Sequence, residues 1–137
     1  MADPTTSTPV ELGARAAARR LADRLHPGLP DEVEAALYAR GAVARPGQYA
    51  DLDSLATLVV SVATLAWTVY NDLRTRAGAP RREVAVRHVE DRLVRGDALP
   101  PSLAPADRDR IIGVTVDEVL DAAARQEEQE EEQEERE

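Results

Sequence analysis

Apolar and polar residues recur with helical spacing along most of the chain, and the strongest pattern covers residues 52–77. From Leu52 to Tyr70 the sequence reads LDSLATLVVSVATLAWTVY. Asp51 or Asp53 can cap the start of this helix, and a glycine at position 78 followed by Pro80 marks its end. At 1.5 Å per residue the pattern predicts a helix of about 37 Å, the longest element of the chain.

The polar residues of this helix fall on one narrow stripe, and the remaining arc, about 250° wide, is apolar. In a helical core the stripe is the edge that faces water. In a bilayer, hydroxyl residues at this spacing let two helices approach closely. The charge-free run at residues 54–70 spans only about 26 Å, less than a hydrocarbon core of about 30 Å, so we expect a core helix. The stripe consists of Ser54, Thr57, Ser61, Thr64, Thr68, Asn71 and Thr75.

Four further helices are predicted, over residues 9–26, 30–40, 80–95 and from Pro105 onward. Thr8-Pro9-Val10-Glu11 has the form of a capping box, and Gly113 is expected to weaken the last helix unless a neighbouring helix packs closely there. The fold prediction is all-α, with about five helices packed as a small bundle around one long central apolar helix. Their expected inward residues are Ala14, Ala17, Ala18, Leu21, Leu25, Val33, Ala36, Leu37, Val86, Val89, Leu93, Ile112, Val116, Val119, Leu120 and Ala123.

Charge divides the chain into a nearly neutral body and an acidic end. Residues 126–137 contribute −7 of the net charge of −9 and contain no apolar side chain. We therefore predict a disordered N-terminus (1–8), a single helical domain (9–125) and an acidic low-complexity tail (126–137). The tail either keeps the protein in solution, contacts a basic partner, or docks onto the arginine-rich helices of its own chain.

Chemistry-bearing motifs are sparse in the 137 residues. Cysteine is absent, the two histidines lie far apart at positions 26 and 88, and no glycine-rich phosphate loop is present. No nucleophile has a base at helical spacing. The sequence therefore predicts no catalytic, cofactor-binding or metal-ligating residues. The arginines of the first and fourth helices alternate with acidic residues, which argues against nucleic acid as a partner.

The expected function is that of a non-enzymatic helical interaction, adaptor or oligomerisation module. All 17 basic residues are Arg and none is Lys, as in GC-rich bacterial genomes. Because cysteine is absent and residues 1–9 lack the pattern of a secretory signal, we expect a cytoplasmic protein. We expect association with a protein partner or with itself, because the apolar arc looks wider than its Ala-rich neighbours can cover. The alternative is a small single-pass or peripheral membrane protein that uses the 52–70 helix. The candidate interaction residues are Leu58, Val62, Leu65, Trp67 and Tyr70.

Overall fold

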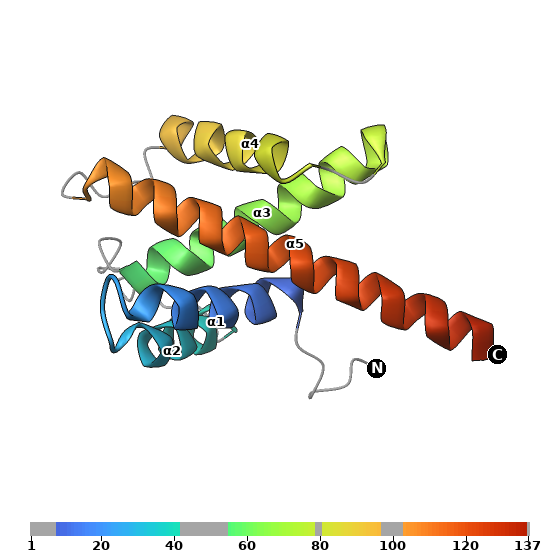
Figure 1. Cartoon of the computed structure of the whole chain (residues 1–137), viewed down its shortest axis with the longest axis horizontal. Helices are drawn as coiled ribbons and strands as arrows, with labels where there is room; N and C mark the ends of the chain where they lie inside the picture. Colours follow the sequence, from blue (N-terminus) through green and yellow to red (C-terminus); the bar gives the residue numbers. More distant parts are fainter. Residues whose placement is uncertain (1–7, 42–54, 79–80, 97–102, 137) are drawn as a thin grey trace.

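The computed structural model describes residues 8–41, 55–78, 81–96 and 103–136, which form five helices and no strand. The helices are α1 (Pro9–Ala22), α2 (Leu29–Gly41), α3 (Leu55–Ala77), α4 (Arg82–Arg95) and α5 (Pro105–Arg136). Figure 1 shows them as one bundle with α5 lying across α3. The all-α prediction is confirmed.

Helix α3 is the centre of the bundle, because it packs against each of the other four helices. Its apolar arc supplies a large part of the core, and Val59, Val62 and Ala66 are fully inaccessible to solvent. The neighbours cover more of this arc than the sequence indicated. Leu55, Leu65, Trp67 and Leu73 remain partly buried at its margins.

The hydroxyl stripe of α3 changes exposure along the helix. Thr57, Ser61 and Thr64 are half-buried in the N-terminal half, where α1 and α2 pack, whereas Thr68 and Thr75 are exposed farther along. The stripe is therefore a solvent-facing edge only in its C-terminal half. Within the described parts of the chain, none of the helices combines the length and the apolar character needed to cross a membrane.

Small residues bring α1 and α5 into close contact. A Cβ atom on Gly13 would lie 2.4 Å from Cγ2 of Val119 and 2.8 Å from its Cα. Ala14, Ala17 and Ala18, farther along α1, are fully buried. By contrast, a Cβ on Gly113 would meet only an Arg82 nitrogen at 3.5 Å. The close approach that could justify a glycine within a helix thus occurs at Gly13.

The first helix begins where the capping box predicts. The Glu11 amide donates to the Thr8 hydroxyl oxygen at 3.2 Å, and the Glu11 carboxylate accepts from that hydroxyl. The helix ends at Ala22, earlier than predicted, although the amide of His26 still donates to the Ala22 carbonyl. The expected caps at 51 and 53 and most of the expected disordered N-terminus lie outside the described residues.

Helix α5 is the longest element, which corrects the expectation for α3. It has 32 residues, or about 48 Å, because it continues through the glutamate-rich segment. Glutamate and glutamine tolerate a helical backbone even without packing partners. From Glu128 to Arg136 its residues are exposed, and in Figure 1 its last turns extend beyond the other helices.

A buried hydroxyl in α5 provides a stability prediction. Thr115 is fully buried, and its Oγ1 has no hydrogen-bond partner among the described residues. We expect Thr115→Val to raise the free energy of unfolding by about 1 kcal/mol, because it removes an unsatisfied polar atom at nearly constant volume. Urea unfolding measures the change. Thr115→Ser is the control, because it keeps the hydroxyl, removes a buried methyl group and should lower stability.

Candidate functional site

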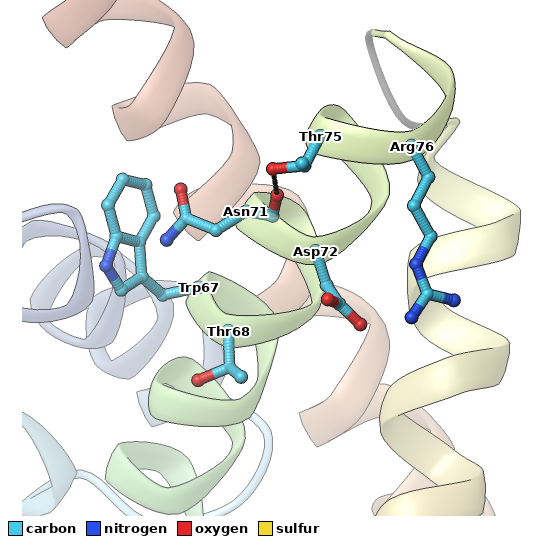
Figure 2. Close-up of a pocket in the computed structure, with 6 residues that line it drawn as sticks. All are labelled: Trp67, Thr68, Asn71, Asp72, Thr75 and Arg76. Atoms are coloured by element: carbon cyan, nitrogen blue, oxygen red, sulfur yellow. Dashed lines mark hydrogen bonds between the residues drawn. The ribbon is translucent and has the colours of Figure 1, made fainter.

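The C-terminal half of α3 carries a shallow hollow of about 460 Å³ on the surface. Its described lining comes entirely from α3, and we call these residues the α3 face (Figure 2). Apart from the partly buried Trp67, all of them are exposed. The residues of the α3 face are Trp67, Thr68, Asn71, Asp72, Thr75 and Arg76.

The α3 face has a centre and two chemically different edges. At 100° per residue, Thr68 and Thr75 occupy the middle, with Trp67 and an asparagine on one edge and Asp72 and Arg76 on the other. Figure 2 shows Trp67 extending to one side of α3 and Arg76 to the other, toward α4. The Asp72 carboxylate also lies 3.5 Å from Arg92 of α4. The face thus combines an aromatic edge, a small central strip and an edge with both charges.

Trp67 stacks on Tyr70, and Tyr70 in turn contacts α5. The two rings lie with their centroids 5.7 Å apart and their planes 13° from parallel. The Tyr70 hydroxyl donates to the carboxylate of Glu127, which also forms an ion pair with Arg74. This cluster joins α3 to α5 at the base of the acidic segment. Within the described tail, the glutamates from 128 to 135 form no ion pair with an arginine, so the structure does not show the tail docked on α1 or α4.

The Tyr70 hydroxyl should titrate unusually late. Burial, together with the hydrogen bond to Glu127, raises the pKa of Tyr70 from 10.0 to about 12. Because the folded state favours the neutral phenol, this contribution to stability is complete below pH 10 and is lost between pH 10 and about 12. A pH titration followed by tyrosinate absorbance measures this. Subtracting the titration curve of Tyr70→Phe from that of the wild type isolates the Tyr70 hydroxyl.

The Glu127→Gln variant separates the two causes of this shift. We expect it to lower the Tyr70 midpoint toward 10 without reaching it, because burial is the larger cause and remains. A midpoint that does not move in Glu127→Gln would contradict the contact between α3 and α5.

The structure separates the five candidate interaction residues into two groups. Leu58 and Val62 lie in the core with 2 % and 0 % exposure, and Tyr70 has 7 %. Leu65 and Trp67 are partly buried, and Trp67 alone lines the hollow. A partner can therefore reach Trp67 without opening the bundle. The involvement of all five residues in association remains a prediction.

Other parts of the described surface indicate a binding site less clearly than the α3 face does. A second hollow, of about 440 Å³ between α4 and α5, is lined by charges of both signs that include Arg87, Glu90 and Asp109. In the described part of the chain, no group of three His, Asp or Glu residues is placed to hold a metal ion. The exposed large apolar residues Leu12, Tyr38, Val84 and Val94 are spread over three helices.

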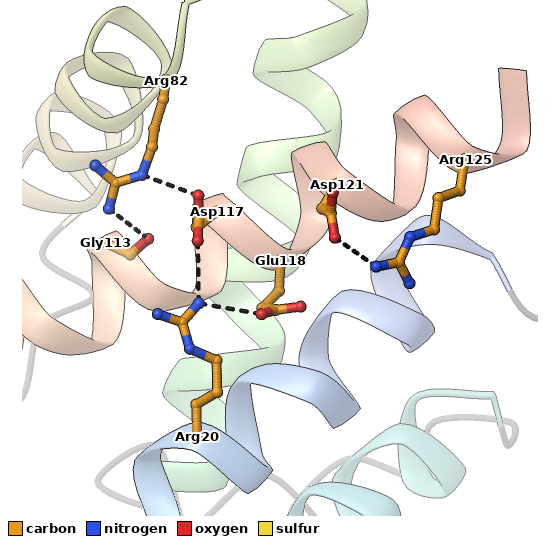
Figure 3. A network of polar contacts seen from close by, with 7 residues as sticks. All are labelled: Arg20, Arg82, Gly113, Asp117, Glu118, Asp121 and Arg125. Atoms are coloured by element: carbon orange, nitrogen blue, oxygen red, sulfur yellow. Dashed lines mark hydrogen bonds and ion pairs between the residues drawn. The ribbon is translucent and has the colours of Figure 1, made fainter. Parts of the chain in front are cut away.

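A polar network connects α5 to two neighbouring helices (Figure 3). Asp117 accepts from Arg20 of α1 at 3.0 Å and lies 3.1 Å from Arg82 of α4, while Glu118 also accepts from Arg20. The hydrogen bond to Asp117, followed by that to Glu118, raises the pKa of Arg20. Because every acidic group here has a cation beside it, the network serves to orient helices.

Part of the α3 face was predictable from the sequence. The helical pattern indicated Trp67 and the hydroxyl stripe, but neither the position of Arg76 on this face nor the contact to Glu127. The 3,4 spacing of the stripe was the available signal, since it already placed Thr68 and Thr75 on one line. Comparison of the chain with protein-family models, curated proteins and solved structures finds no match.

Proposed function

We propose that this chain is a non-enzymatic helical module that acts by binding protein, either other copies of itself or a larger partner. The observation that carries the proposal is the placement of Trp67, the only tryptophan of the sequence. A folded helix holds it partly exposed beside a surface hollow, and stacking on Tyr70 limits its motion. Tryptophan is enriched at interface positions that dominate binding energy, and a ring that is already ordered loses little entropy on binding.

The polar composition of the α3 face supports a protein partner more than a lipid one. Thr68, Asn71 and Asp72 surround the aromatic ring with hydrogen-bonding groups, as in the rim of a protein interface. The apolar arc that a membrane-lying helix would use is instead packed inside the bundle. We propose a cytoplasmic location on the absence of cysteine from the sequence.

Capture from a lysate of the native host tests this function. The full chain with an N-terminal tag is the bait, in the wild-type form and as Asn71→Arg, which places a long charged side chain beside Trp67 on the aromatic edge of the α3 face. Ala39→Arg on the exposed surface of α2 is the matched control. We expect proteins that the wild type and Ala39→Arg retain to be lost with Asn71→Arg. If the wild type retains no protein, including untagged copies of itself, the proposal is wrong.

A further inference from the structure

We propose that the α3 face binds the same face of a second copy, with the two α3 helices antiparallel across a two-fold axis. This deepens the proposed function and rests on it. A two-fold contact between identical faces is self-complementary, so each feature must fit itself or another feature of the same face. The α3 face meets this condition at its centre and at both edges.

At the centre, Thr68 of one copy faces Thr75 of the other. This pairing places the two-fold axis at the level between residues 71 and 72 of α3. The axis repeats the pairing, so each Thr68 faces Thr75 of the other copy. The Thr68 hydroxyl donates to the Thr64 carbonyl at 3.0 Å, and the Thr75 hydroxyl donates to the Asn71 carbonyl at 2.8 Å. Because both hydroxyls are satisfied within their own helix, the helices can approach closely without leaving a buried polar atom unpaired.

In an antiparallel two-fold pair, each edge of the face meets the same edge of the second copy. At the first edge the two Asn71 amides meet beside the axis, and each Trp67 ring, about 7 Å farther along α3, packs against the C-terminal turns of α3 in the second copy. This buries the exposed part of an aromatic surface that the bundle leaves partly open.

The second edge carries both charges. The Arg76 guanidinium lies near the level of Asp72 along α3 (Figure 2), and among the described residues it has no carboxylate partner. In the pair, each Arg76 reaches Asp72 of the second copy, and Asp72 has lone pairs left beside its contact with Arg92. An acidic or a basic partner would leave one of these two charges facing a like charge. The charges therefore favour a second copy.

The size of the contact predicts weak association. Residues 67–76 span about 14 Å, or nearly three helical turns, whereas stable interfaces bury at least about 1,200 Å². The net charge of −9 on each copy adds repulsion. We therefore expect a dimer whose population depends on protein concentration.

Sedimentation equilibrium and tryptophan emission of the full chain, from about 1 μM to about 1 mM, measure this association. Because Trp67 is the only tryptophan, its emission should shift to shorter wavelength, and its quenching by acrylamide should weaken, as the dimer forms. The double variant Thr68→Glu, Thr75→Glu places like charges opposite each other and should raise the dimer Kd at least about tenfold.

The double variant Thr68→Glu, Thr75→Lys supplies the matched test of register. In the antiparallel pair it places opposite charges together, so its Kd should stay within about threefold of the wild type. Both positions are exposed, and circular dichroism confirms that each variant is folded. Ala35→Glu, Ala39→Glu on α2 adds the same charge as the repulsive variant and should leave the Kd unchanged.

Three outcomes overturn the proposal: a wild type that remains monomeric throughout, a repulsive variant that associates like the wild type, or two α3 variants that lose association equally. The first, combined with successful capture of another protein from the lysate, would leave the proposed function standing. In that case only the identity of the partner would be wrong.

Discussion

Replacing Val62 with Asp is expected to unfold the protein. Val62 has 0 % exposure and lies in the middle of α3, the helix that contacts all the others. A carboxylate there is either charged without a partner or neutral with an unsatisfied hydroxyl, and the cost is about 5 kcal/mol or more. Domains of this kind are stable by only about 5–15 kcal/mol, so circular dichroism should show largely lost helix.

The Thr64→Ala variant is the control for this prediction. Thr64 lies two residues farther along the same helix, is half-buried, and its hydroxyl donates to the Val60 carbonyl at 2.9 Å. This bond lies within one helix, so its loss should change the free energy of unfolding by less than about 1 kcal/mol. If Val62→Asp remained folded with the thermal midpoint of Thr64→Ala, α3 would not be the core of the molecule.

The second large effect is expected at the contact between α1 and α5. Gly13→Ala should lower the free energy of unfolding by about 3 kcal/mol, because the new methyl group would overlap the Val119 side chain and backbone. A side chain can rotate away, but the Val119 Cα at 2.8 Å moves only if the two helices separate. Urea unfolding monitored by circular dichroism measures the loss.

The same substitution at Gly113 has the opposite expected sign. A methyl group there meets only the flexible end of Arg82 at ordinary contact distance, and alanine favours the helix by about 1 kcal/mol over glycine. We therefore expect Gly113→Ala to be stabilising. Equal effects at the two glycines would show that α1 and α5 do not approach as described.

Local patterns in the sequence were sufficient to predict the helices and most of the residues on their inward faces. Helix spacing predicted the burial of Val33 in α2, Val89 in α4 and Val116 in α5, which all have 0 % exposure. The capping box at Thr8 correctly marked the start of α1. These features depend on residues within a few turns of each other, which is the range over which periodicity is informative.

Features that depend on contacts between distant segments were not predictable in this way. The sequence drew attention to Gly113, whereas the close helix contact is at Gly13, because only the crossing of α1 and α5 decides which glycine meets a backbone. The contact between Tyr70 and Glu127 joins residues 57 positions apart. The coverage of the apolar arc likewise depends on how closely the Ala-rich α1 can pack, which composition alone does not give.

The α3 face combines a feature that the local sequence predicted with one that depends on contacts between distant segments. The spacing of the hydroxyl residues predicted a solvent-facing line, and Thr68 and Thr75 lie on it and are exposed. The half-buried Thr57 and Ser61 continue the same line, and their burial depends on α1 and α2 packing nearby. The location of the candidate surface was thus partly encoded in local sequence, while its extent was set by tertiary packing.

Hydrogen exchange along α3, measured at low and high protein concentration, is the most direct test that this helix is both the core and the binding surface. We expect amides of residues 58–66 to exchange slowest at every concentration, through global unfolding only. Residues 67–76 should gain protection as the concentration rises. Rapid exchange of residues 58–66, or a gain of protection confined to another helix such as α2, would contradict this role of α3.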